Sequence, residues 1–150
     1  MKLKKGDQIP DITLSDQDGA RINLRRFVDQ ALIIFFYPKD NTPVCTAEAC
    51  LFEAHYKELK EAGAEVIGIS SDPVSSHKKF ATRYHLDYRL LSDVDGEAEK
   101  LFGIKRKLFG LIKERVTFVF NKEGKLVHII QSQYNGKRHV KEAIAALNTD

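Results

Sequence analysis

Cysteine is scarce in this sequence, and long apolar runs are missing. Only two of the 150 residues are cysteine, too few for a disulfide scaffold. No apolar run approaches the roughly 20 residues that a membrane helix requires. The opening MKLKKGDQIPDITL lacks the apolar block of a secretory signal. We therefore expect a cytoplasmic protein without a membrane segment, where a cysteine pair usually serves chemistry.

Charge is abundant but nearly balanced. Charged residues make up 30% of the chain, and the formal net charge is +3. This excess is too small to argue for a nucleic-acid partner. With 43% hydrophobic residues and no repeat, low-complexity segment or linker, the sequence predicts a single domain over residues 1–150.

Short apolar runs alternate with helical patterns. Apolar runs rich in β-formers predict strands at residues 12–14, 22–24, 31–37, 66–69, 90–91, 116–120 and 126–131. Cap, proline and glycine signals predict helices at about 42–62, 72–84, 97–102 and 139–147. The run ALIIFFY is typical of a central strand covered on both faces. This order predicts an α/β fold, with a central mixed sheet flanked by helices.

The first cysteine falls where the central strand gives way to a helix. Thr42 or Asn41 can cap this helix and Pro43 fits its first turn, which places Cys45 at the helix start. Unpaired N–H groups and the helix dipole favour a thiolate there. A helix end contributes only about 0.3–2 kcal/mol. A strongly acidic thiol therefore needs a nearby cation, for which Arg115 is the candidate.

The second cysteine, Cys50, follows five positions later. On a continuous helix, residues at this spacing have Cα atoms about 8.5–9 Å apart, whereas a disulfide needs less than about 7 Å. Cys45 and Cys50 can therefore join only if the helix unwinds, or they never join. The five histidines are scattered along the chain, so we expect no metal site. The C-x-x-x-x-C spacing also differs from the C-x-x-C of dithiol reductases.

Each candidate residue has a simpler structural explanation. Cys45 could be a small buried hydrophobe, Thr42 only an N-cap and Pro38 a strand terminator. Arg115 could form a surface ion pair. Glu48, one turn after Cys45, could pair with Arg115 or be an exposed helix carboxylate.

The basic segment KRKLFGLIK, residues 105–113, interleaves charged and apolar residues. It could dock a partner or an anionic surface. The interpretation that we prefer is a solvated loop with Leu108 and Phe109 tucked inward.

The run PKDNTPVC, residues 38–45, fits the P-x-x-x-T-x-x-C signature of peroxiredoxins. The following TAEAC resembles the bacterioferritin comigratory protein or peroxiredoxin Q subgroup. The resemblance extends from about Gly6 to Leu147 and includes GISSDP, LLSD and RVTFVF in the family's order. It implies a thioredoxin-like fold and thiol-dependent reduction of hydrogen peroxide and organic hydroperoxides, without a cofactor, in antioxidant defence and redox homeostasis. The chain departs from the subgroup at Val44, where glycine is usual.

The resemblance also implies roles for five residues. Cys45 would be the peroxidatic cysteine that becomes a sulfenic acid, and Cys50 the resolving cysteine that forms an intramolecular disulfide with it. Thr42 would hydrogen-bond the peroxide and the thiolate, Arg115 would hold the thiolate and polarise the peroxide, and Pro38 would shield the pocket. A thioredoxin or similar dithiol reductant would regenerate the enzyme, which we expect to be a monomer.

Two other functions compete with the peroxidase hypothesis. A non-catalytic redox sensor would form the same disulfide without repeated turnover. A nucleic-acid-binding module would use residues 105–113 and would bind with a strong salt dependence.

Overall fold

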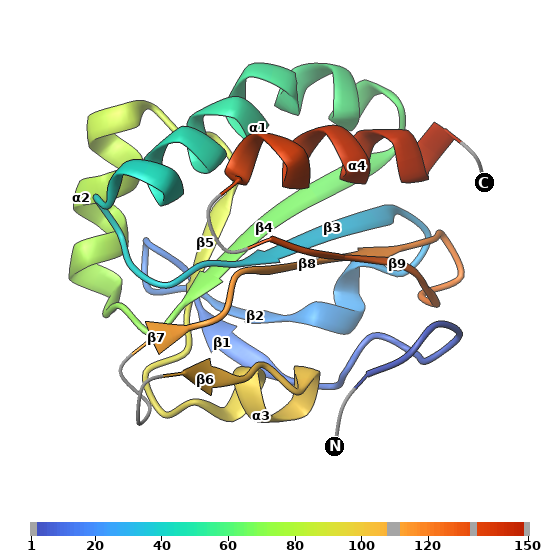
Figure 1. Cartoon of the computed structure of the whole chain (residues 1–150), viewed down its shortest axis with the longest axis horizontal. Helices are drawn as coiled ribbons and strands as arrows, with labels where there is room; N and C mark the ends of the chain where they lie inside the picture. Colours follow the sequence, from blue (N-terminus) through green and yellow to red (C-terminus); the bar gives the residue numbers. More distant parts are fainter. Residues whose placement is uncertain (1–2, 108–111, 133–134, 149–150) are drawn as a thin grey trace.

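The computed structural model describes residues 3–107, 112–132 and 135–148. Its main sheet has seven strands in the order β2-β1-β5-β4-β3-β8-β9, with helices around it (Figure 1). The strands of this sheet are β1 (Thr13–Ser15), β2 (Arg21–Asn23), β3 (Ala31–Phe36), β4 (Ala64–Ser70), β5 (Arg89–Ser92), β8 (Val116–Phe120) and β9 (Leu126–Gln131). The α-helices are α1 (Pro43–Glu61), α2 (Val74–Tyr84), α3 (Glu97–Phe102) and α4 (Gly136–Asn148).

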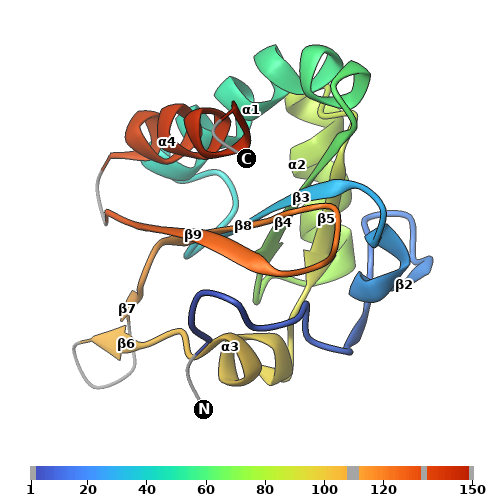
Figure 2. The same cartoon turned by 90° about the vertical axis from the view of Figure 1, so that its right-hand side faces the viewer.

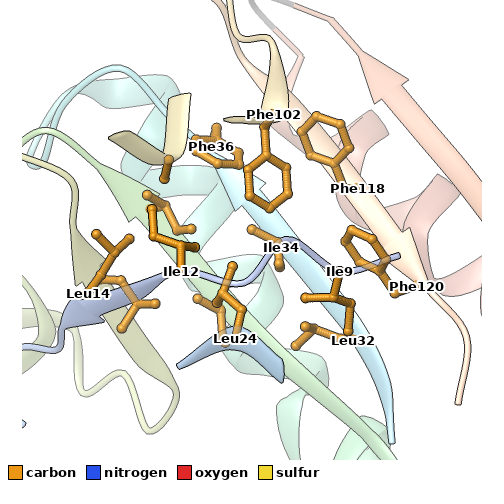
Figure 3. Close-up of a cluster of buried hydrophobic side chains, with 14 of the residues drawn as sticks. Ile9, Ile12, Leu14, Leu24, Leu32, Ile34, Phe36, Phe102, Phe118 and Phe120 are labelled. Carbon is orange, nitrogen blue, oxygen red and sulfur yellow. The ribbon is translucent and has the colours of Figure 1, made fainter. Parts of the chain in front are cut away.

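The central strand β3 is parallel to β4 and antiparallel to β8, so the sheet is mixed as predicted. Leu32, Ile34 and Phe36 point to one face, into an apolar cluster that includes Phe102 of α3 (Figure 3). The alternate side chains of β3, Phe35 among them, enter a second cluster against α1, α2 and α4. Burial of each large apolar side chain contributes about 1.5–3 kcal/mol. Apolar packing on both faces therefore fixes the position of β3, and with it the point at which the following segment begins.

The two long helices α1 and α4 lie side by side over one face of the sheet (Figures 1 and 2). The start of α4 approaches α1 at Gly136, where a side chain would meet the backbone of α1. Glycine permits this close approach because it has no Cβ. The first turns of α1 thus pack against the beginning of α4.

Several predicted helices and strands differ from the structure by one to three residues at their ends. The last helix begins at Gly136, three residues before the predicted start at His139. The strand expected at 22–24 ends at Asn23, because the Asn23 side chain accepts from the Arg25 N–H and caps a short 3-10 helix, η1 (Leu24–Phe27).

The basic segment 105–113 contains two short strands, β6 (Arg106–Lys107) and β7 (Ile112–Lys113), which pair antiparallel. The prediction of a loop without regular structure was therefore wrong at both ends of this segment. Leu108 and Phe109, which we expected to tuck inward, lie outside the described residues.

Candidate active site

Cys45 lies in the first turn of α1, and its side chain is buried, at 1% exposure. The helix begins at Pro43, immediately after Thr42, as the sequence predicts. The first helical hydrogen bond runs from the Thr46 N–H to the Thr42 carbonyl oxygen, at 2.8 Å. The N–H groups of the first turn have no acceptor within the helix. Together with the helix dipole, they favour negative charge on the Cys45 sulfur.

The cation beside this sulfur is Arg115. Its Nη2 donates to Cys45 Sγ at 3.1 Å, and its Nη1 donates to Glu48 Oε1 at 2.6 Å. The antiparallel register of β3 with β8 pairs Phe36 with Val116. Arg115 precedes Val116, so it reaches the end of β3 from which the chain continues to Cys45. The predicted approach of Arg115 is confirmed, and the surface ion pair is excluded because Arg115 is buried.

Glu48 lies three residues after Cys45 and is fully buried. The alternative of an exposed helix carboxylate was therefore wrong. Glu48 Oε1 accepts from Arg115, whereas Oε2 has no hydrogen-bond partner among the described residues. Burial raises the pKa of Glu48 to about 7, although the charge and hydrogen bond of Arg115 lower it. The carboxyl group thus changes its protonation near neutral pH.

A buried histidine of α4 completes this cluster. His139 Nε2 lies 2.8 Å from the Ser132 carbonyl oxygen, which can only accept, so Nε2 carries the proton. The other ring nitrogen, Nδ1, accepts from the Thr117 hydroxyl at 2.7 Å and lies 3.8 Å from Glu48 Oε2. Burial lowers the pKa of His139 to about 4, so the ring is neutral at pH 7. Sequence reasoning did not assign His139 to the site; its only signal is a place on an amphipathic helix.

Thr42 and Pro38 border the helix start without a hydrogen bond to the thiol. The Thr42 hydroxyl donates to the Lys39 carbonyl oxygen at 2.8 Å, and the Thr42 side chain does not cap α1. The cap predicted for Thr42 is therefore formed by its backbone alone. Because the single hydroxyl hydrogen is committed to Lys39, the Thr42 oxygen is left as an acceptor. Pro38 is half-buried, two positions beyond the end of β3.

Cys50 lies further along the same helix. α1 is continuous from Cys45 to Cys50, and both cysteines are free thiols. Burial raises the pKa of Cys50, and the negative charge of Glu53 raises it further. Cys50 is therefore a protonated thiol at neutral pH, separated from Cys45 by an intact helical turn.

Comparison with known proteins places this chain in a family of thiol peroxidases. The chain matches the AhpC/TSA family over residues 5–129, and it belongs to that family. The relatives that it resembles include peroxiredoxin Q of Oryza sativa subsp. japonica, named as chloroplastic. That protein is 40% identical over 148 residues, which cover 99% of this chain and 68% of the relative. The chloroplastic peroxiredoxin Q of Arabidopsis thaliana is 42% identical over 146 residues, covering 97% and 68% of the two chains.

Solved structures agree with this assignment. The peroxidoxin BcpB of Mycobacterium tuberculosis superimposes with a TM-score of 0.90 at 39% identity, covering 98% of this chain and 97% of that chain. A cysteine mutant of Xanthomonas campestris peroxiredoxin Q gives 0.87 at 32% identity, covering 97% and 99%. The fold is therefore thioredoxin-like, and the protein is a thiol-dependent peroxidase, an oxidoreductase with an antioxidant function. No helix among the described residues is long and apolar enough to cross a membrane.

Proposed function

We propose that Cys45 is the residue that reacts with the peroxide. Its thiolate attacks the terminal oxygen of the hydroperoxide, the S–O bond forms as the O–O bond breaks, and sulfur loses two electrons to the peroxide. Cys45 becomes a sulfenic acid, and the departing alkoxide, or hydroxide in the case of hydrogen peroxide, takes up a proton from solvent and leaves as an alcohol or as water. The observation that carries this proposal is the 3.1 Å contact between Arg115 Nη2 and the buried Cys45 sulfur at the start of α1.

An acidic thiol alone does not make a fast peroxidase. A lower pKa increases the thiolate fraction of a thiol but reduces the nucleophilicity of each thiolate. The remaining acceleration must come from aligning the peroxide and from stabilising charge on the departing oxygen. Arg115 is suited to the second task. The Thr42 oxygen, whose own hydrogen is bound by Lys39, is suited to accept from the peroxide hydroxyl, and Pro38 to shield the pocket.

The second step in this proposal joins the two cysteines. The Cys50 sulfur attacks the Cys45 sulfenic acid, the S–O bond breaks, and the departing hydroxide leaves as water. The intact α1 holds the two residues too far apart for this bond. The helix must therefore unwind between Cys45 and Cys50 after the first step. A thioredoxin or similar dithiol then donates two electrons and restores both thiols.

Mass spectrometry and turnover assays test these roles. Wild-type protein treated with a small excess of hydrogen peroxide should lose two hydrogens and both free thiols. Cys45→Ser should not react. Cys50→Ser should gain one oxygen at an unchanged rate but recycle slowly with a thioredoxin system. Two intact thiols after peroxide treatment of the wild type would refute the proposal, and a single turnover despite the thioredoxin system would instead indicate a redox sensor.

The finer properties of the enzyme are also proposals. We propose that it acts on hydrogen peroxide and organic hydroperoxides as a monomer in the cytoplasm. The two cysteines lie on one chain and one helix, so resolution does not require a second subunit. Sedimentation of the reduced and oxidised forms tests this state, and a dimer in either form would contradict it.

A further inference from the structure

Asp40 is part of the segment between Pro38 and Thr42, yet its side chain is almost wholly buried, at 4% exposure. Its Oδ1 accepts from the Tyr37 hydroxyl at 2.6 Å, and its Oδ2 accepts from the Ser76 hydroxyl at 2.7 Å. Such bonds to a carboxylate are stronger than those between neutral groups. The start of the segment that leads to Cys45 is therefore bonded both to Tyr37, the residue that follows β3, and to α2.

A histidine of α2 provides the central bond to this carboxylate. His77 is fully buried, and its Nδ1 lies 2.8 Å from Asp40 Oδ2. The Asp40 N–H also donates to Asp72 Oδ2, at 2.8 Å. The side chain of Asp40 is thus held by α2, and its backbone is held by the turn that follows β4.

Both ring nitrogens of His77 face an oxygen atom. Its Nε2 lies 3.1 Å from the Leu91 carbonyl oxygen of β5, which can only accept, so Nε2 carries a proton. Burial would raise the pKa of Asp40, but the hydrogen bonds and charge of His77, with bonds from Tyr37 and Ser76, lower it below its usual value. The side chains of Asp40 and His77 therefore form a buried hydrogen-bonded pair.

The next residue after Asp40 marks a change in the backbone. Asn41 is exposed and adopts a left-handed conformation, with φ at +64°, which asparagine tolerates better than most residues. Thr42 and Pro43 follow at the start of α1, in the part of the chain that must unwind before Cys45 can reach Cys50. Asn41 therefore lies between Asp40, which is hydrogen-bonded through its side chain and backbone, and the first turns of α1, which must unwind.

We propose that the Asp40–His77 pair, here called the clamp, has two effects on the reactions of Cys45. It positions Pro38 and Thr42 during peroxide reduction. It also holds the chain in place up to Asp40, so that the segment that unwinds has a fixed end and begins at Asn41. The structure shows neither residue in contact with Cys45 through a hydrogen bond, so both are positioning residues that act through their neighbours. The inference rests on the proposed function, because both of its effects are measured on reactions of Cys45. In the oxidised protein the chain up to Asp40 stays on α2, while the residues from Asn41 onward rearrange.

Single-turnover kinetics test the positioning effect. In a Cys50→Ser background, His77→Leu and Asp40→Asn should each slow the oxidation of Cys45 by hydrogen peroxide by about tenfold or more, since small misplacements of aligning groups cost large factors in rate. His77→Asn keeps an N–H donor near the position of Nδ1 and should recover most of the lost rate. The matched control is Ala81→Gly, which weakens α2 without removing a bond to Asp40 and should leave the rate unchanged.

Amide hydrogen exchange tests the fixed end. In the wild-type disulfide form, amides from Thr46 to Cys50 should lose protection, whereas the Asp40 amide, bonded to Asp72, should keep it. In His77→Leu the loss should extend to Asp40. Equal loss at Asp40 and Thr46 in the wild type would overturn the fixed end. Oxidation rates of the clamp variants within about twofold of Ala81→Gly would overturn the positioning role.

Two further comparisons keep the outcomes distinct. If wild-type Cys45 does not react with peroxide, the proposed function fails. If it reacts and His77→Leu matches the control, only the clamp fails. Ser76→Ala removes a single bond from a half-buried hydroxyl and provides a milder variant if the others do not fold. It should slow the oxidation less than His77→Leu, and a rate equal to the control would count against the clamp.

Discussion

Gly136 at the start of α4 lies so close to Glu48 of α1 that a Cβ at position 136 would stand 2.8 Å from the Glu48 Cβ. The same atom would lie 3.2 Å from the Val44 carbonyl oxygen. Neither neighbour is the end of a flexible side chain, so the backbone itself would have to move. The turn that carries Cys45 is therefore confined on one side by α4 and on another by Arg115.

Gly136→Ala should destabilise the protein because the added methyl group must displace one of the two helices. We expect a loss of about 1–3 kcal/mol in the free energy of unfolding, as for other overpacked sites. Chemical denaturation of the reduced protein measures this loss. Lys137→Ala, at the exposed neighbouring position, is the matched control and should change the stability little. Equal stability of the two variants would show that the helices can separate freely.

Arg115→Ala should slow the oxidation of Cys45 by hydrogen peroxide by roughly 10²–10³-fold, the usual loss when a donor to a developing charge is removed. Arg115→Lys should recover only part of this rate, since an ammonium cannot reproduce the two-pronged contact with Cys45 and Glu48. Stopped-flow kinetics at pH 7 measure both variants. Arg83→Ala, in the last turn of α2, should react like the wild type. Full activity in the lysine variant would mean that charge alone suffices.

Val44→Gly should accelerate disulfide formation. Glycine within a helix is less favourable than valine by about 0.3 kcal/mol, since valine is itself a weak helix former, which raises the population of an unwound first turn by up to about twofold. The rate at which the Cys45 sulfenic acid is consumed should rise by that factor, while the first reaction with peroxide should not change. Lys57→Gly, beyond Cys50 on the same helix, carries a larger cost in helix propensity and should leave the disulfide rate unchanged. If both variants accelerate the step equally, the opening is not confined to the first turns.

Glu48 and His139 should give opposite pH dependences of stability. The folded-state pKa of Glu48, about 7, lies above its usual 4.5. Its contribution is therefore complete below pH 4.5 and is lost as the pH rises toward 7. The folded-state pKa of His139, about 4, lies below its usual 6.5. Its contribution is complete above pH 6.5 and is lost as the pH falls toward 4.

Each of these groups changes the free energy of unfolding by an amount on the order of 1–3 kcal/mol. Plotted against pH, the Glu48 contribution falls and the His139 contribution rises, so the two slopes largely cancel in the wild type between pH 4.5 and 6.5. Glu48→Gln should expose the His139 slope, with stability rising with pH. His139→Gln should expose the Glu48 slope, with stability falling as pH rises. Denaturation at several pH values measures both, and Glu58→Gln, exposed on α1, is the control. Parallel curves for all variants would contradict the assigned shifts.

Sequence patterns were sufficient for the parts of the site that depend on one element and its nearest pairing. The proline and the polar residues before Cys45 predicted the helix start, which Pro43 occupies. Arg115 is a candidate cation in the sequence because it enters the strand predicted at 116–120, and the register of Phe36 with Val116 shows that this strand pairs with β3. The five-residue spacing predicted two separate thiols, and both are free.

Other features depend on packing between elements that are distant in the sequence, and local patterns do not encode that packing. Glu48 and His139 are ordinary polar residues on amphipathic helices, and they become buried only because α4 lies over α1. The Thr42 hydroxyl donates to the Lys39 carbonyl oxygen, and its oxygen accepts no N–H of α1, so a local bond to the preceding backbone takes the place of the expected side-chain cap. The organisation as a single domain, the monomeric state and the cytoplasmic location stay predictions.

The continuous helix between Cys45 and Cys50 has a consequence for the survival of the enzyme. In the proposed cycle, the sulfenic acid persists until α1 unwinds, and during that interval a second peroxide molecule can convert it to sulfinic acid, which most enzymes cannot reverse. The stability of this short stretch of helix therefore sets the peroxide concentration at which the protein begins to inactivate itself.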